Sequence, residues 1–282
     1  MVHAISAASR KPKAVRLPKM WRERWKEVVR RELLTAPFPD AFVRLGTKLS
    51  GVFASTGGGG RGQSSLSGGG AAWESLVAWY CNLCLVGTTS VVFKKHSHVP
   101  EPIKDALSVS YKGVESNKEA DLIAVTFPNP PEVQPEPTME VIASSMFSEC
   151  SVSIIQCKTN WNDNSQIPMM WNILYEALKV EGITLGRNGR FLGRLRQFSY
   201  AFVTVPTNDP DEIKPSSLIA RRVQNLTGGN YWGRETRQGV ARSMFELFAG
   251  GSIGPDGGRG VRDHLEASIK GISDIPSYFK LS

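Results

Sequence analysis

One uncharged stretch that runs into a polar end constrains the fold of this 282-residue chain more than any other feature. Residues 151–155 carry no charge, and they lead directly into Gln156, Cys157 and Lys158. A short apolar run of this kind is typical of a strand buried in a sheet. Strand residues two apart point to the same face, so Gln156 and Lys158 are expected to project together while Cys157 faces the opposite layer.

The order of the other expected elements predicts an α/β fold. Alternating or apolar runs predict strands, in addition to 151–158, over 106–113, 121–127 and 200–206. Amphipathic periodicity and glycine stops predict helices over 71–87, 166–182, 216–229 and 240–250. The proline-rich segment 128–138 is excluded from regular structure. The sequence therefore predicts a mixed central β-sheet flanked by helices.

The first 70 residues are expected to form a basic helical arm followed by a Gly/Ser-rich loop. A helix around 21–34 has an apolar stripe of Trp21, Trp25, Val28 and Val29. This helix either docks on the core or presents its Lys and Arg residues to phosphates. Residues 55–70 lack the Lys-Ser/Thr pair of a phosphate-binding loop and are interpreted as a loop or linker. Residues 71–282 are expected to form the core.

Charge and cysteine usage restrict the partners and the compartment. The net charge of +8 and the pI near 9.4 favour a polyanionic partner such as nucleic acid or an anionic membrane, although a soluble basic protein without such a partner is an equal alternative on charge alone. No apolar run is long enough for a membrane span, and no secretory signal is recognised, so a cytoplasmic protein is expected. The Cys81/Cys84 pair lacks the further ligands of a zinc site, and His96 and His98 lack the partners of a histidine-metal nuclease. Both pairs are interpreted as structural or surface residues.

Asp121 opens the strand that is expected to pair with 151–158. If the two strands form a hairpin, its carboxylate meets Gln156 and Lys158 at one end of the sheet. A carboxylate, an amide oxygen and the backbone carbonyl of Cys157 are suitable ligands for Mg²⁺. Lys158 is placed to hold or deprotonate a water, which is the chemistry of phosphodiester hydrolysis.

These residues resemble the motif of the PD-(D/E)XK nuclease superfamily, especially type II restriction endonucleases, over about 70–206. The resemblance implies an α-β-β-β-α-β restriction-endonuclease-like core, with Asp121 on the second strand and Gln156-Cys157-Lys158 in place of (D/E)XK. It also implies a Glu on the leading helix, which Glu74 supplies; Glu115, Glu119 and Asp163 are weaker candidates. The sequence departs from the family pattern at two positions, because Ala120 replaces the Pro and Gln156 replaces the acidic residue. The replacement by Gln156 removes a negative charge and is expected to weaken metal binding.

Polar and basic residues in the second half are candidates for contacts with DNA. Asn160 and Asn162 can pair with adenine edges, or they can cap a helix. Six arginines are candidates for phosphate or guanine contacts, or simply for a solvated surface: Arg187, Arg190, Arg194, Arg234, Arg237 and Arg242.

The sequence as a whole favours a type II restriction endonuclease that makes sequence-specific double-strand cuts in DNA with Mg²⁺. A palindromic target implies a homodimer, and the function implies a bacterial or archaeal cytoplasm. Two alternatives stay open. One is a DNA-repair or recombination nuclease of the same fold, and the other is a non-catalytic DNA-binding protein with a degenerate site.

Overall fold

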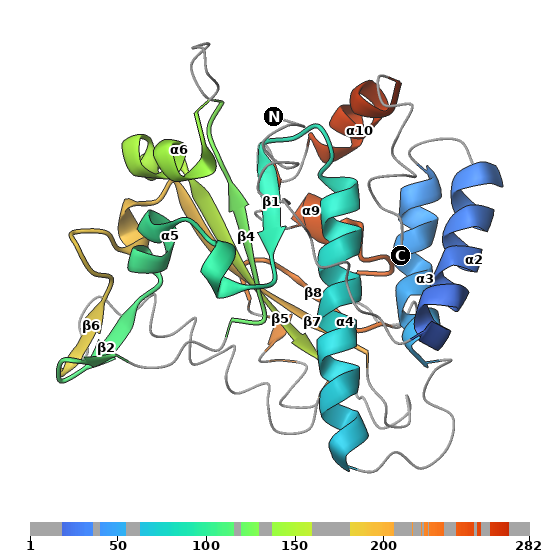
Figure 1. The fold of residues 1–282 in the computed structure, drawn as a ribbon, viewed down its shortest axis with the longest axis horizontal. Coiled ribbons are helices and arrows are strands. Elements are labelled where there is room, and N and C mark those ends of the chain that lie inside the picture. The colour runs from blue at the N-terminus through green and yellow to red at the C-terminus, as the bar shows by residue number, and fades with distance from the viewer. Residues whose placement is uncertain are drawn as a thin grey trace.

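A five-stranded mixed sheet lies at the centre of this mixed α/β structure (Figure 1). The computed structural model describes residues 19–35, 40–54, 63–115, 120–129, 137–159, 181–205, 216, 221, 223–224, 226–233, 241–250, 253–254 and 260–270. The strands, in spatial order, are β1 (Ser90–Phe93), β4 (Leu122–Thr126), β5 (Ser151–Lys158), β7 (Gln197–Thr204) and β8 (Asn230–Tyr231). Pairing is antiparallel from β1 through β4 to β5, and parallel from β5 through β7 to β8.

A second, three-stranded sheet is formed by β3, β2 and β6. Its strands are β2 (Val109–Tyr111), β3 (Val114–Glu115) and β6 (Ile183–Leu185). Lys112 and Gly113 form the two-residue turn between β2 and β3 with φ values of 48° and 81°. Two successive positive φ angles match the right-handed twist of a tight hairpin.

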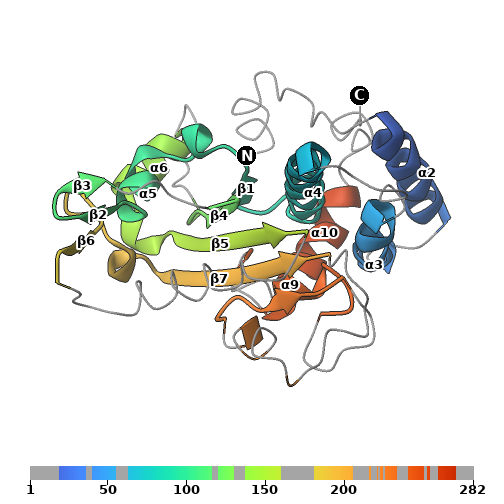
Figure 2. The same ribbon diagram turned by 90° about the horizontal axis from the view of Figure 1, so that it is seen from below.

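The described helices flank the sheet. They are α2 (Lys19–Thr35), α3 (Asp40–Ala54), α4 (Gln63–Cys84), α5 (Glu101–Ala106), α6 (Met139–Ser145), α9 (Glu246–Gly250) and α10 (Val261–Lys270), with short 3₁₀ turns η1 (His96–His98), η2 (Phe147–Glu149) and η3 (Leu192–Arg194). Two views show α2, α3 and α4 grouped on one side and α5, α6 and the small sheet on the other (Figures 1 and 2). None of the described helices is long and apolar enough to cross a bilayer.

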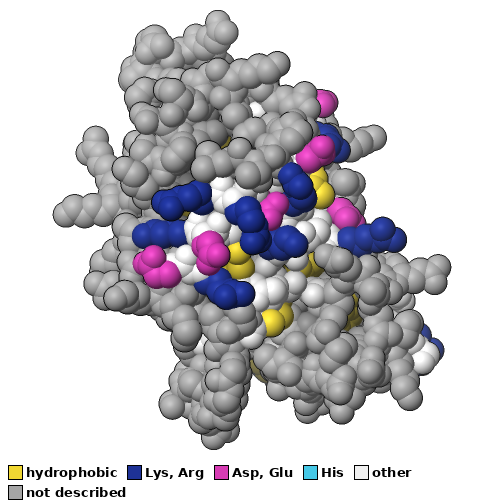
Figure 3. All heavy atoms as spheres, turned by 90° about the vertical axis from the view of Figure 1, so that its right-hand side faces the viewer, with side chains coloured by type: hydrophobic (Ala, Val, Ile, Leu, Met, Phe, Trp, Pro, Cys, Tyr) yellow, Lys and Arg dark blue, Asp and Glu magenta, His cyan; other side chains and the backbone are white. Residues whose placement is uncertain are grey.

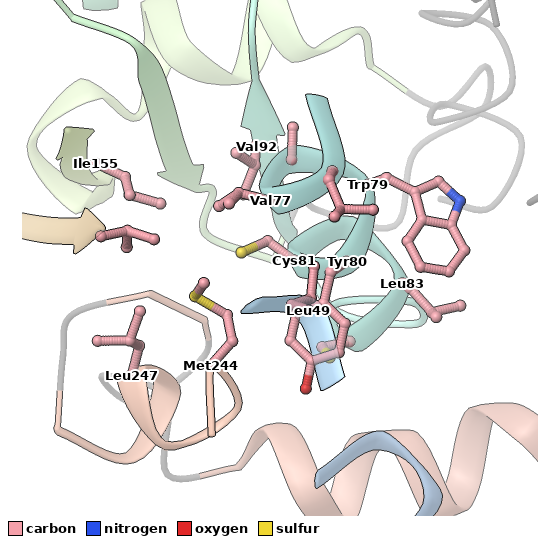
Figure 4. Packing of buried hydrophobic residues seen from close by; sticks show 14 of the residues in the cluster. Leu49, Val77, Trp79, Tyr80, Cys81, Leu83, Val92, Ile155, Met244 and Leu247 are labelled. Carbon is pink, nitrogen blue, oxygen red and sulfur yellow. The ribbon is translucent and has the colours of Figure 1, made fainter. Parts of the chain in front are cut away.

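Alternation along the strands divides the core into two clusters. Ile155 and Cys157 of β5 pack with α3 and α4, whereas Ile154 packs with residues of α5 and α6. Figure 4 shows the first cluster, in which Cys81 of α4 lies among Val92, Ile155 and Leu247 side chains. Burial is the largest cause of the raised pKa of the Cys81 thiol, about 12, so this cysteine is a neutral packing residue.

Several expected elements shift in the structure. The strand expected over 106–113 is only β2, and it belongs to the small sheet rather than to the central one. The central sheet instead begins with β1, whose four residues are too few to display a clear alternation. Helix α4 begins at Gln63, so part of the expected Gly/Ser loop is helical. The helix expected from residue 71 extends toward the N-terminus because each residue added to an existing helix gains one hydrogen bond. Within the described part of the helix expected over 240–250, only α9 (Glu246–Gly250) is helical.

Helices α2 and α3 pack on the core and leave a charged outer face. Trp25 of α2 is fully buried and meets Trp79 of α4 edge to face, with ring centroids 5.1 Å apart. Figure 3 looks onto this side of the molecule, where Lys and Arg side chains are interspersed with Asp and Glu. The nearly buried Glu32 pairs with Arg31 at 3.2 Å and with Arg44 at 3.5 Å, which ties α2 to α3. The helix therefore docks through its apolar stripe.

Candidate active site

The pairing of β4 with β5 brings Asp121 beside Gln156. Leu122 is opposite Ile155 in the antiparallel register, so Asp121 and Gln156 form the next pair just beyond the end of β4. The amide Nε2 of Gln156 donates a hydrogen bond to Asp121 Oδ2 at 2.7 Å. The backbone N–H of Cys157 donates to the same oxygen at 2.8 Å. Two N–H donors on one carboxylate oxygen stabilise its ionised form.

Lys158 completes the cluster. Its Nζ lies 3.8 Å from Asp121 Oδ2, and both side chains are 19% exposed. The structure therefore brings together the carboxylate, the amide and the ammonium expected from the sequence, at an edge that remains accessible to solvent. A charged pair with this accessibility can meet an ionic substrate without the full desolvation cost of a buried pair.

Tyr200 of β7 determines how the Gln156 side chain is oriented. Its hydroxyl donates to Gln156 Oε1 at 3.0 Å, and both residues are fully buried. Because the hydroxyl occupies the amide oxygen, the amide nitrogen is the end that faces Asp121. Tyr200 was not among the residues predicted from the sequence, because only the β5–β7 register, in which Ile154 is opposite Tyr200, places it on the Gln156 face.

Cys157 contributes its backbone rather than its thiol. The N–H and C=O groups of one strand residue point to the same edge, so the carbonyl of Cys157 lies on the side of Asp121. The thiol is buried in the opposite layer. Burial raises the pKa of the Cys157 thiol well above its usual range, and the negative charges of Asp121 and Glu74 raise it further. This thiol is therefore neutral and is not a nucleophile.

Glu74 of α4 is paired with a lysine. Its Oε2 lies 3.3 Å from the Nζ of Lys94, which follows β1. Lys94 also donates to Ser75 Oγ at 2.6 Å and to the Ala71 carbonyl. The charge of Glu74 reaches the Cys157 thiol, so Glu74 lies on the face of the sheet that this thiol occupies, opposite the Gln156 side chain.

The oxygen donors fit a weakly held hard cation. Among the described residues, no three His, Cys, Asp or Glu side chains cluster closely enough to enclose a metal ion. Asp121 supplies a carboxylate, and the Cys157 carbonyl lies on the same edge. The amide oxygen of Gln156 is bonded to Tyr200 and would have to exchange places with its nitrogen to become a ligand. Mg²⁺ tolerates such a small protein set, because it keeps several waters and binds substrate phosphates.

Three of the arginines that were candidates for DNA contacts, Arg187, Arg190 and Arg194, lie at the other end of the sheet. The Arg196 N–H bonds to the Cys150 carbonyl where β5 begins, whereas Lys158 ends the same strand (Figure 2). Eight strand residues span about 25 Å. Arg187 pairs with Asp105 and Glu101, Arg190 lies 3.8 Å from Asp105, and Arg194 donates to the Gly189 carbonyl at 2.9 Å. The structure thus does not place these arginines beside the candidate site.

The remaining expected DNA contacts are mostly outside the described residues. Asn160, Asn162, Arg234 and Arg237 all lie there. Arg242 is exposed just before α9, and its backbone N–H donates to Glu246 Oε2 at 3.1 Å. Its guanidinium stays a candidate for contact with DNA.

Comparison with models of known protein families and with curated proteins found no match to this chain. The site must therefore be interpreted from its own geometry.

Proposed function

We propose that this protein is a Mg²⁺-dependent endodeoxyribonuclease of the PD-(D/E)XK superfamily, and specifically a type II restriction endonuclease. The observation that carries the proposal is the convergence of Asp121, Gln156 and Lys158 at one end of two paired strands. The same end presents a backbone carbonyl, a partly exposed carboxylate and a partly exposed ammonium. Such a set suits hydrolysis of a phosphodiester better than chemistry that requires a nucleophilic thiol or an imidazole.

The strand order supports the same family. Helix α4 precedes three successive antiparallel strands of the central sheet, and β7 then joins β5 in parallel. This resembles the family's α-β-β-β-α-β core. The helix that the family has between the third and fourth strands falls in residues 160–180, outside the described part. Helix α5 and strands β2 and β3 are inserted between the first two strands of that core, and β6, which completes the small sheet, lies between the third strand and the fourth.

Each residue of the site has a role in the proposed reaction. Asp121 and the carbonyl of Cys157 would hold the ion. When bound, Mg²⁺ neutralises the phosphate and lowers the pKa of a water molecule. Lys158 would hold the attacking water or help to deprotonate it, and would offset the negative charge that develops on the phosphate. Gln156 keeps the Asp121 carboxylate oriented through its Nε2 bond, and Glu74 would support the water shell.

A plasmid-cleavage assay tests the proposal. The purified chain with Mg²⁺ is expected to convert supercoiled plasmid to discrete fragments, and EDTA is expected to stop the reaction. Lys158→Ala is expected to lower the cleavage rate by about 100-fold or more, the usual range for loss of a proton-transfer group. Lys26→Ala is the matched control, because Lys26 lies on α2 and pairs only loosely with Glu23 at 3.9 Å. Unchanged cleavage by Lys158→Ala would reject the proposed role.

Sequencing the ends of the digested DNA then separates restriction from repair. A short, repeated sequence at every cut is expected for a restriction enzyme, and a two-fold symmetric target would imply a homodimer in the cytoplasm of its host. Cuts at junctions or lesions would instead indicate a repair nuclease.

A non-catalytic DNA-binding protein is the second candidate. Two observations favour it: Tyr200 occupies the Gln156 amide oxygen, and Lys94 pairs with Glu74. Both reduce the negative charge and the oxygen atoms offered to a cation. Retardation of duplex DNA in a gel, without cleavage at any Mg²⁺ or Mn²⁺ concentration, would support this candidate over the nuclease.

A further inference from the structure

Strand β1 leads into a turn that is rich in lysine and histidine and contains none of the site residues. Residues 94–98, the basic turn, read Lys-Lys-His-Ser-His and include the 3₁₀ turn η1. Four of the five side chains are therefore lysine or histidine. All residues of the turn are exposed except Lys94, which is half-buried. The two histidines, expected from the sequence to be surface residues, are both exposed.

The register of β1 places this turn at the end of the sheet that holds Asp121. Phe93 is opposite Ile123, so two further residues along each strand (93 + 2 and 123 − 2) bring Lys95 level with Asp121. The backbone of Lys95 is still extended, with φ −102° and ψ 122°. Strand β4 lies between β1 and β5. The basic turn therefore lies on one side of Asp121, and Lys158 lies on the other.

The turn is held at both ends. Asn82 of α4 binds the free edge of β1, accepting from the Val92 N–H at 2.8 Å and donating to the Val92 carbonyl at 2.9 Å. Lys94 is tied to α4 through Glu74 and Ser75. At the other end the His98 N–H donates to the Lys95 carbonyl at 2.9 Å, and Val99 is buried. A segment whose backbone is fixed in this way loses little conformational entropy when it binds an anion.

The neighbouring carboxylates are already engaged. Glu74 pairs with Lys94, and Glu101 of α5 pairs with Lys104 and Arg187. Within the described part of the chain, no carboxylate pairs with Lys95. The charge of Lys95 is therefore offered to solvent at the same edge as the candidate active site.

We propose that the basic turn binds the phosphodiester backbone of duplex DNA on the β1 side of Asp121. This inference rests on the proposed function, since it assigns the DNA chemistry to the same end of the sheet. An exposed lysine on a held segment suits contact with a phosphate of the duplex backbone. Phosphate contacts of this kind position a duplex without reading its sequence, so the turn is expected to bind DNA of any sequence.

Fluorescence anisotropy with a labelled duplex of about two helical turns tests the inference, in EDTA so that cleavage does not interfere. Lys95→Ala is expected to weaken binding several-fold and to reduce the slope of log K against log salt by about 0.9, the value for one lost phosphate contact. Lys95→Glu is expected to weaken binding further, and Lys95→Arg to keep it. Lys48→Ala is the matched control, because Lys48 is an exposed lysine of α3, which lies across α4 from β1 (Figure 1).

The outcomes separate this inference from the proposed function. If the unmodified chain cleaves plasmid but Lys95→Ala binds duplex as Lys48→Ala does, the basic turn is not a DNA contact and the nuclease proposal stands. If the chain binds duplex through Lys95 and never cleaves, the inference stands and the nuclease proposal fails. Absence of duplex binding by the unmodified chain would overturn the inference whatever the cleavage assay gives. Far-ultraviolet circular dichroism checks that each variant is folded.

Discussion

At the scale of single residues, the site depends on which end of one amide faces a carboxylate. A glutamine side chain can present either its nitrogen or its oxygen, and its partners decide between them. Tyr200 donates to Oε1, so Nε2 is directed to Asp121 Oδ2. A glutamine held by this pair of partners supports an ionised aspartate, whereas a glutamate at the same position would oppose it.

The first prediction concerns Tyr200→Phe. Removing the hydroxyl leaves Gln156 Oε1 without its buried donor, so the amide is free to turn and Asp121 loses a fixed N–H bond. The Mg²⁺ concentration that gives the half-maximal cleavage rate is expected to change several-fold. The free energy of unfolding is expected to fall by about 1–2 kcal/mol. Cleavage rates across a Mg²⁺ titration and urea unfolding curves are the measurements.

Tyr80→Phe is the matched control for that prediction. The Tyr80 hydroxyl is also fully buried and donates to the Phe42 carbonyl at 2.6 Å, in the α3–α4 packing. It should lose comparable stability but keep the Mg²⁺ dependence of the unmodified protein. If both tyrosine variants change the Mg²⁺ dependence alike, Tyr200 is merely a packing residue.

The second prediction concerns Gln156→Glu. The new carboxylate would face Asp121 Oδ2 across a contact that is now a 2.7 Å hydrogen bond. Two carboxylates this close repel each other unless one is protonated or a cation lies between them. The variant is therefore expected to melt several degrees lower in EDTA, and to regain more stability on adding Mg²⁺ than the unmodified protein does. Differential scanning calorimetry with and without Mg²⁺ measures both effects.

The double variant Asp121→Asn, Gln156→Glu provides the control, because only one carboxylate remains. It should recover stability in EDTA and respond less to Mg²⁺ than Gln156→Glu alone. A Gln156→Glu protein that melts identically with EDTA and with Mg²⁺ would mean that no cation binds at this end of the sheet.

At the scale of elements, the sequence predicted strands well where an apolar run was long and failed where it was short. The bounds of β5 were predicted because its last residues change abruptly from apolar to polar. Strand β4 was predicted to within one residue at each end, so the position of Asp121 beside Gln156 was also predicted. Strand β1 was missed because four residues give no clear period, so the basic turn that follows it was not connected with the site. Tyr200 could not be assigned because parallel register is set by tertiary contacts.

The small sheet is anchored to α5 by a single buried carboxylate. Asp105 is only 2% exposed, and it accepts from Arg187 and from Asn188, the latter at 3.0 Å. Burial alone would raise the pKa of Asp105, but the hydrogen bonds from Arg187 and Asn188 and the charges of Arg187 and Arg190 outweigh it, so the pKa is lowered. The arginines therefore have a structural role at this end of the molecule.

The third prediction follows from that lowered pKa. A carboxylate with a depressed folded-state pKa adds stability above its unfolded pKa, near 4, and this stability is lost as pH falls through the folded value. Asp105→Asn is expected to destabilise the protein by about 1–3 kcal/mol at pH 7, and by progressively less below about pH 4. Urea unfolding at several pH values measures the difference.

Asp40→Asn is the control for Asp105. Asp40 pairs with Arg262 at 2.7 Å, but the two side chains are 62% and 51% exposed, so this pair is expected to add less than about 1 kcal/mol. If the two variants lose equal amounts of unfolding free energy at pH 7, the burial of Asp105 does not strengthen its ion pairs.

At the scale of the whole molecule, three segments far apart in sequence meet at one glycine of α3. The Gly46 carbonyl accepts from the Met244 N–H at 3.4 Å, and Tyr80 of α4 lies close by. The Ser243 hydroxyl also donates to the Val43 carbonyl of α3 at 2.6 Å. These contacts join the first 70 residues to the C-terminal part through the same hydrophobic cluster that covers one face of the sheet. The boundary predicted at residue 70 therefore divides the sequence at a place where the packing continues.

The last prediction tests whether these segments unfold together. In Gly46→Ala the new Cβ would overlap the Ser243 hydroxyl and lie 2.5 Å from the Tyr80 hydroxyl. Overpacking of this kind is expected to destabilise by about 1–3 kcal/mol. Gly51→Ala is the matched control, because it lies on the same helix with no atom within 4 Å of the added Cβ, and is expected to stabilise by about 0.5–1 kcal/mol. In one cooperative unit, tryptophan fluorescence and far-ultraviolet circular dichroism would report the same shifted midpoint for each variant. Two separate transitions, with Gly46→Ala moving only one, would instead establish the N-terminal helices as an independently folding arm.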